Sequence, residues 1–221
     1  MKRKIGEDNI KEVTFYKMHG QEQHDTHEDW KQKYKIPGGP TQPEIIAVSL
    51  SKLEIQPDDF VADIGCGTGT VTVALAKQAN KVFAIDARSE AISCTQEQCL
   101  HKKCSNIEII QGDARTIIPT PKKIDRAFCG GSKGIDEIIN LLYIHGAVRI
   151  VVNAVLLETV ISAMQAMKDN GMKCEVVHLQ ISRSTELTMR TMLVPINPVY
   201  IITGTRMDHH NPNYENNNEK Y

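Results

Sequence analysis

The stretch Asp63-Ile64-Gly65-Cys66-Gly67-Thr68-Gly69 decides the fold of this chain of 221 residues. It follows an apolar, β-branched run at residues 60–64 and precedes a helical pattern at about 70–79. Glycines at such a junction permit a tight turn and let a ligand approach the backbone closely. A glycine loop between a strand and a helix is typical of the first crossover of a doubly wound α/β sheet.

The spacing of these glycines separates classes of ligand. A dinucleotide fingerprint, G-x-G-x-x-G, would need glycine at position 70, where Thr70 stands. The loop also lacks the Lys-Ser/Thr ending of a P-loop. We interpret the G-x-G-x-G pattern as a site for S-adenosylmethionine, which has no phosphate and needs no anion cradle. The alternative for an isolated loop of this kind is a tight turn without a ligand.

Outward from the loop, apolar runs of strand length alternate with segments of helical length, which predicts a parallel sheet covered on both faces. The runs are 60–64, 82–85, 107–110, 124–128 and 148–152, and the helical segments are about 70–79, 88–104, 133–146 and 156–170.

The end of the pattern differs, because the strand-like runs 174–187 and 197–205 have no helix between them. They predict an antiparallel C-terminal hairpin joined across Met192 to Asn197, a segment that includes Pro195. The predicted fold is therefore α/β, a doubly wound, seven-stranded and mostly parallel sheet of the Rossmann-like class I methyltransferase type.

Composition predicts one domain at residues 37–207, a polar N-terminal extension at 1–36 and a disordered tail at 208–221. The formal net charge of -1 argues against a general polyanion binder. No uncharged apolar run suits a secretory signal or a membrane span, and the six cysteines form no C-x-x-C pair. We therefore expect a cytoplasmic protein. His19, His24 and His27 are read as solvated, with a metal site as the alternative, so no metal is expected.

Two aspartates strengthen the cofactor interpretation. Asp86 ends the second strand and is placed to accept hydrogen bonds from ribose hydroxyls, while Asp113 and Ala114 follow the third strand and would face an adenine ring. The alternative for each aspartate is a helix cap. Upstream, Thr41 and Glu44 match a capping box, which is compatible with a helix placed over the cofactor.

Several stretches together resemble the cobalt-precorrin-6B methyltransferase (decarboxylating) family of cobalamin biosynthesis, over about residues 36 to 206. The resemblance rests on residues 40–45, 63–69, 112–114, 130–132, 152–159 and 197–199. It implies methylation of carbon-15 of a corrin precursor with loss of carbon dioxide from an acetate arm, and a homotetramer. It also implies cofactor contacts by Thr41, by the loop Gly65, Cys66, Gly67, Thr68 and Gly69, by Asp86 and by Ala114. We add Asp113 to these predicted contacts. The N-terminal 35 residues are longer and more polar than the usual lead-in of the family.

The fourth and fifth strands end in Gly130-Gly131-Ser132 and Asn153, and these small or polar residues leave room for a broad, flat tetrapyrrole. Ser132 and Asn153 are the candidate catalytic residues; the alternatives are a turn for the glycines and a helix cap for Asn153. Cys129 is read as a core thiol rather than a nucleophile. A basic rim for substrate carboxylates would draw on four candidates: Lys133, Arg149, Arg183 and Arg190.

Two other functions remain open at this point. A transfer-RNA adenine methyltransferase would share the fold and the cofactor loop, although the balanced charge does not favour nucleic acid as a partner. A non-catalytic module that binds S-adenosylmethionine would keep the loop and bind no second substrate.

Overall fold

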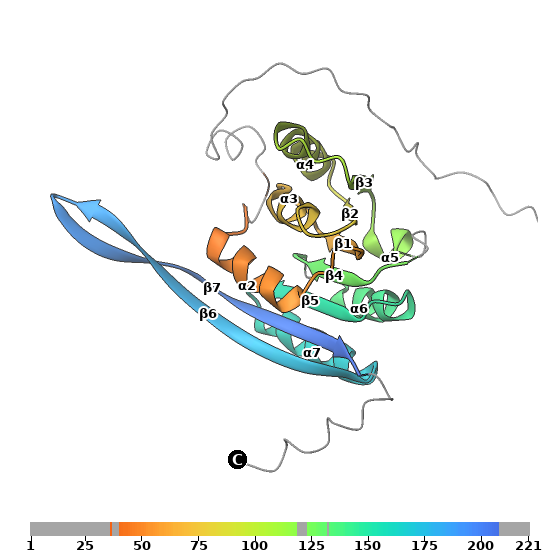
Figure 1. Ribbon diagram of the computed structural model, residues 1–221. Coiled ribbons are helices and arrows are strands. Elements are labelled where there is room, and N and C mark those ends of the chain that lie inside the picture. The colour runs from red at the N-terminus through yellow and green to blue at the C-terminus, as the bar shows by residue number, and fades with distance from the viewer. Residues whose placement is uncertain (1–35, 37–39, 119–122, 132, 208–221) are drawn as a thin grey trace, which may run out of the picture.

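In the part of the chain that the structure describes, seven strands form one sheet in the order β3-β2-β1-β4-β5-β7-β6 (Figure 1). The structure, a computed structural model, describes residue 36 and residues 40–118, 123–131 and 133–207. The strands are β1 (Phe60–Ile64), β2 (Lys81–Asp86), β3 (Ile107–Gln111), β4 (Arg126–Cys129), β5 (Arg149–Ala154), β6 (Met172–Leu187) and β7 (Arg190–Arg206). The first five run parallel, and β7 is antiparallel to both β5 and β6. The predicted doubly wound sheet with an antiparallel hairpin is confirmed.

Helices cover both faces of the sheet, as near-continuous apolar strands require. They are α2 (Pro43–Leu53), α3 (Thr70–Ala76), α4 (Ser89–His101), α5 (Ala114–Ile117), α6 (Ile135–Ile144) and α7 (Leu157–Asp169). One core cluster joins α5, α6 and α7 to the sheet, and a second joins α2 and α3 to it. A smaller cluster packs Ile92 of α4 against Ala84 and Cys66. Because β1 to β5 run parallel, their carboxyl ends share one edge of the sheet, between the two helical layers.

The hairpin turn lies away from the predicted position. The chain reverses at Thr188 and Met189, which both have positive φ (47° and 61°), and not between Met192 and Asn197. Pro195 lies inside β7, opposite Ser182. Because β5 pairs only with residues 200–205 of β7, the outer half of that strand has one neighbouring strand, β6, and proline in a strand is found mainly at such edge positions.

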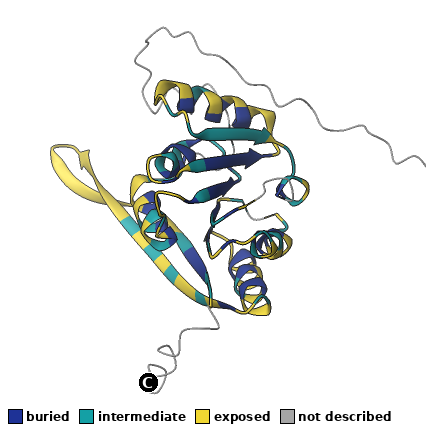
Figure 2. Cartoon of the chain, turned by 45° about the vertical axis from the view of Figure 1, so that its right-hand side comes forward, coloured by how far each residue is buried: buried dark blue, intermediate teal, exposed yellow. Residues whose placement is uncertain are grey.

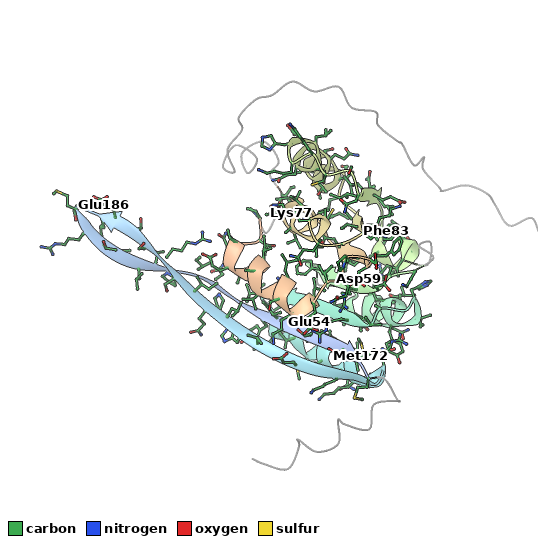
Figure 3. The ribbon with its side chains drawn as sticks, viewed as in Figure 1. Glu54, Asp59, Lys77, Phe83, Met172 and Glu186 are labelled. Atoms are coloured by element: carbon green, nitrogen blue, oxygen red, sulfur yellow. The ribbon has the colours of Figure 1, made fainter. Side chains whose placement is uncertain are left out.

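The outer half of this hairpin extends beyond the rest of the sheet, as Figure 2 shows. Large apolar side chains are exposed toward its tip, where Figure 3 labels Glu186. They are Leu187, Met189, Met192, Leu193 and Val194. An exposed apolar strand pair of this length is typical of a surface that another chain covers.

Some predictions concern residues outside the described part of the chain. The N-terminal extension, with His19, His24 and His27, and the tail at 208–221 lie there, so their interpretation stays a prediction. Within the described residues, no group of three or more His, Cys, Asp or Glu side chains could hold a metal ion. None of the helices described there is long and apolar enough to cross a bilayer.

Candidate active site

A cavity of about 390 Å³ lies at the carboxyl edge of the parallel strands. Its lining comes from the glycine loop, the ends of β4 and β5, the start of α2 and the middle of β7. Ligand sites in open α/β sheets occupy this crevice, and the volume lies in the range of small-molecule pockets. The lining includes Thr41, Gly65, Cys66, Gly67 and Thr68, which were all predicted to contact the cofactor.

The glycine loop is held tightly against the sheet. Gly65, Gly67 and Gly69 all have positive φ (77°, 57° and 78°), which side chains other than glycine rarely adopt. The Gly65 amide donates to the carbonyl of Ile85 at 2.8 Å. A Cβ on Gly69 would lie 2.9 Å from the Cα of Thr95, so the helix α4 packs directly on the loop. Each glycine is therefore required by the backbone conformation or by close packing.

Asp63 is a fully buried carboxylate in the lining of the cavity. Its Oδ2 accepts from Thr72 Oγ1 at 2.5 Å, whereas its Oδ1 has no hydrogen-bond partner among the described residues. Burial raises the pKa of Asp63 to about 7, and the nearby charge of Asp86 adds to the rise. An unpartnered acceptor of this kind fits a cationic ligand such as the ammonium or sulfonium of S-adenosylmethionine.

The raised pKa of Asp63 predicts a pH-dependent stability. The folded state binds this proton more tightly than the unfolded chain, whose pKa is near 3.8. The free energy of unfolding should therefore fall as the pH rises from about 4 to about 7 and then level off. Because the asparagine side chain does not titrate, we expect Asp63→Asn to lack this fall in the free energy of unfolding between pH 5 and pH 8, as measured by urea denaturation. Exposed Asp58→Asn is the control, and equal losses in the wild type and Asp63→Asn would contradict the prediction.

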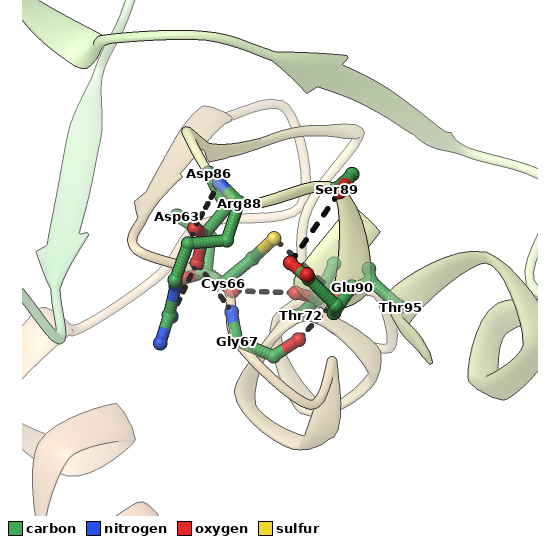
Figure 4. Close-up of polar contacts among 9 residues, drawn as sticks. All are labelled: Asp63, Cys66, Gly67, Thr72, Asp86, Arg88, Ser89, Glu90 and Thr95. Atoms are coloured by element: carbon green, nitrogen blue, oxygen red, sulfur yellow. Dashed lines mark hydrogen bonds and ion pairs between the residues drawn. The ribbon is translucent and has the colours of Figure 1, made fainter. Parts of the chain in front are cut away.

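Asp86 ends β2 beside the loop and is almost fully buried. Its Oδ2 accepts from the Gly67 amide at 3.1 Å and from Arg88 Nη2 at 2.8 Å. Its Oδ1 accepts from the Arg88 amide at 3.0 Å and from Arg88 Nε at 2.9 Å (Figure 4). Burial acts to raise the pKa of Asp86, but the hydrogen bonds from Arg88 outweigh it and leave that pKa below its usual value. Asp86 is not the helix cap considered as the alternative, because the N-cap of α4 is Arg88.

Asp113 and Ala114 lie at the end of β3, outside the lining of the cavity. Asp113 is the N-cap of α5: its side chain accepts from the Arg115 amide at 3.0 Å. The guanidinium of Arg115 also donates to Asp113, at 2.6 Å and 3.0 Å, and these bonds lower the pKa of Asp113 to about 2. The capping alternative is therefore present in the structure, and a contact of Asp113 and Ala114 with adenine stays a prediction.

The start of α2 borders the cavity through Thr41, Gln42 and Ile45. The predicted capping box is wrong, because the N-cap is Gln42 and Pro43 occupies the first helical position. Pro43 is favourable there, since the first amide of a helix has no partner within it. The predicted placement of this helix beside the cofactor loop agrees with the lining.

The ends of β4 and β5 form the opposite wall of the cavity. Gly130 and Asn153 are both in the lining, and Gly131 lies next to the loop, where a Cβ on Gly65 would come within 3.0 Å of its amide nitrogen. Asn153 does not cap α7, whose N-cap is Leu156. Its Nδ2 donates instead to Ser49 Oγ of α2 at 3.0 Å. Ser132 falls outside the described residues, so its catalytic role stays a prediction.

The structure also gives the positions of Cys129 and of the four basic residues predicted for the substrate rim. Cys129 is fully buried in the core, and burial raises the pKa of its thiol, as expected of a structural cysteine. Arg149 begins β5, at the end remote from Asn153, where it binds Glu54, so its placement on a substrate rim is wrong. Arg183 pairs with Glu44 of α2 at 2.5 Å, and Arg190 begins β7 at the tip of the hairpin. Lys133 is exposed just after the end of β4.

Sequence comparison identifies the family. A family model described as the precorrin methyltransferase domain matches residues 32–206. The chain belongs to the precorrin methyltransferase family. A relative from Methanosarcina acetivorans, named probable cobalt-precorrin-6B C(15)-methyltransferase (decarboxylating), is 44% identical over 176 residues, which span 77% of this chain and 96% of the relative. A relative of the same name from Methanosarcina mazei is equally similar, with the same coverage.

Solved structures agree with this assignment to the precorrin methyltransferases. The crystal structure named precorrin 8W decarboxylase, from Methanobacterium thermoautotrophicum, has a TM-score of 0.74 and 36% identity, covering 78% of this chain and 94% of that one. A precorrin-6Y C5,15-methyltransferase from Geobacter metallireducens has a TM-score of 0.72 and 30% identity, covering 76% and 91%. A transfer-RNA (m1A58) methyltransferase from Aquifex aeolicus, 14% identical at a TM-score of 0.66 over 83% of this chain and 77% of that one, shares the fold alone.

Proposed function

We propose that this precorrin methyltransferase transfers a methyl group from S-adenosylmethionine to carbon-15 of cobalt-precorrin-6B, with decarboxylation of the neighbouring acetate side chain. The single observation that supports this most is the 44% identity to relatives of that name over 96% of their length. The cavity supports it independently, because its residues suit both a nucleoside cofactor and a broad second substrate. The family assignment leaves the transfer-RNA alternative with the shared fold as its only support.

The site fits S-adenosylmethionine through contacts that differ in chemistry. The loop Gly65 to Gly69 offers close backbone approach, and Asp86 lies beside the loop. Asp63 Oδ1 is a buried acceptor that no described residue partners. We assign the ribose hydroxyls to Asp86 and the cationic methionine portion to the neighbourhood of Asp63. The bound cofactor supplies an electrophilic methyl group activated by its sulfonium charge. Gly130, Gly131 and Asn153 would then position the electron-rich carbon of the macrocycle in line with it.

The assembly and location follow from the same proposal. We propose a homotetramer in the cytoplasm, with the exposed apolar tip of the β6–β7 hairpin as a contact between chains. Closed homo-oligomers bury such surfaces through repeated contacts, which supports an assembly of several copies. The six cysteines, none of which forms a disulfide, are consistent with a reducing compartment.

Cofactor identity is tested by thermal unfolding with two candidate ligands. A ligand that binds only the folded state raises the melting temperature by mass action. We expect S-adenosylhomocysteine to raise it and NAD, at equal concentration, to leave it unchanged, because Thr70 replaces the third glycine of a dinucleotide loop. Stabilisation by NAD alone would contradict the cofactor assignment.

The reaction itself is tested by incubating the full chain with cobalt-precorrin-6B and labelled S-adenosylmethionine. Methyl incorporation into the tetrapyrrole and released carbon dioxide are followed together. We expect both products in equal amounts. Cofactor binding without either product would favour the non-catalytic alternative, and labelled transfer RNA in a parallel reaction would favour the RNA alternative.

A further inference from the structure

Arg88 holds Asp86 in a state that leaves no room for the ribose. A carboxylate offers about four acceptor positions. Arg88 fills three of them, through its amide, Nε and Nη2, and the Gly67 amide fills the fourth. Figure 4 shows the Arg88 side chain folded back onto Asp86. Two ribose hydroxyls can donate to this carboxylate only if the guanidinium first leaves it.

The guanidinium also lies in the space that the cofactor would enter. Arg88 is part of the cavity lining, and a Cβ on Gly67 would lie 3.9 Å from its Nη2. The Arg88 side chain is 42% exposed, whereas that of Asp86 is 4% exposed. Displacement therefore moves the exposed partner and leaves the buried carboxylate in place beside the loop.

The displaced guanidinium keeps its charge, because arginine does not lose it in proteins, and an anionic second substrate would offer it a new partner. Among the described residues that line the cavity, Arg88 is the only one with a cationic side chain. The proposed substrate carries several carboxylates and must reach the same cavity. Arginine binds carboxylates through a planar fork, the geometry that it already uses on Asp86.

We propose that Arg88 is a specificity-determining residue that passes from Asp86 to a carboxylate of the acidic tetrapyrrole when the cofactor's ribose takes its place. This inference rests on the proposed function and adds a binding order to it. With the cofactor absent, the cation is occupied within the protein. With the cofactor bound, it becomes available to the second substrate, so cofactor occupancy strengthens substrate binding.

Calorimetry tests the coupling directly. The dissociation constant of cobalt-precorrin-6B is measured with and without saturating S-adenosylhomocysteine, for the wild type, Arg88→Gln, Arg88→Lys and Lys102→Gln. Lys102 is an exposed cation at the other end of α4, and its removal is the matched control. We expect S-adenosylhomocysteine to tighten substrate binding roughly tenfold in the wild type and in the control. Arg88→Gln should lose this enhancement, and Arg88→Lys should retain part of it.

Cofactor affinity separates this role from a structural one. Arg88→Gln should bind S-adenosylhomocysteine at least as tightly as the wild type, because its competitor for Asp86 is gone. Weaker cofactor binding in a folded Arg88→Gln protein would overturn the inference, since Arg88 would then be a cofactor contact. Undiminished coupling in Arg88→Gln would also overturn it while leaving the proposed function intact. A wild-type protein that neither binds nor methylates the tetrapyrrole would overturn both this inference and the proposed function.

Discussion

Gly131→Leu should abolish methyl transfer to cobalt-precorrin-6B while the protein stays folded and still binds S-adenosylhomocysteine. Among the described residues, a Cβ built on Gly131 meets no atom within 4 Å, and the φ of Gly131 is not one of the positive values found there. The backbone therefore tolerates a side chain, which would project into open space beside the loop. If this corner is the floor on which the macrocycle lies, the leucine side chain occupies the substrate's position.

The neighbouring glycine is the control for this prediction. A Cβ on Gly130 would lie 3.3 Å from Phe128 Cε1 and 3.4 Å from the carbonyl of Gly65, so Gly130→Leu should lower stability and cofactor affinity together. Thermal unfolding, calorimetry and turnover of labelled cofactor distinguish the two variants. A folded Gly131→Leu enzyme with full activity would refute the placement of the substrate at this corner.

Gly67→Val should weaken S-adenosylhomocysteine binding by more than roughly tenfold, about 1.4 kcal/mol. Gly67 lines the cavity at φ 57°, and a branched side chain there would stand where the cofactor must approach the backbone. The positive φ also strains valine, by roughly 1–2 kcal/mol, whatever ligand is present. The binding measurement must therefore be separated from this loss of stability.

Gly171 supplies the matched control. It has φ 69°, its Cβ would meet none of the described residues within 4 Å, and it follows α7 outside the cavity lining. Gly171→Val should lose a similar amount of stability and keep its full affinity for S-adenosylhomocysteine. Equal affinities in Gly67→Val and Gly171→Val, both folded, would exclude the loop as the cofactor site.

Local patterns in the sequence were sufficient to predict the parallel part of the fold. The first strand was predicted at residues 60–64, where the structure places it, because its apolar run ends at the glycine loop. The helix α5 (Ala114–Ile117) was missed, since four residues are too few to show a helical period. The hairpin turn was misplaced because Thr188 and Met189 adopt positive φ without the Asn-Gly or Asp-Gly signal of such turns.

The site divides in the same way between local and long-range information. The glycine loop and Asp86 were visible from spacing along one βα unit. The bond between Asn153 and Ser49 joins residues 104 positions apart and has no signal in a single sequence. Arg88 was overlooked although it lies only two residues after Asp86, because the sequence does not show that a guanidinium folds back onto that carboxylate. That spacing is the one local signal that could have suggested the pair.

The β6–β7 hairpin connects the cavity wall to the exposed apolar tip. Ile196, Asn197 and Val199 form part of the cavity wall, and the same strand continues outward to the exposed tip. Arg183 fastens the hairpin to Glu44 at the start of α2, which borders the cavity from another side. The inner half of the hairpin therefore lines the site, and its outer half is exposed. If another copy of the chain binds the outer half and bends or stiffens it, the cavity wall formed by the inner half would change shape as well. Turnover per chain would then depend on protein concentration.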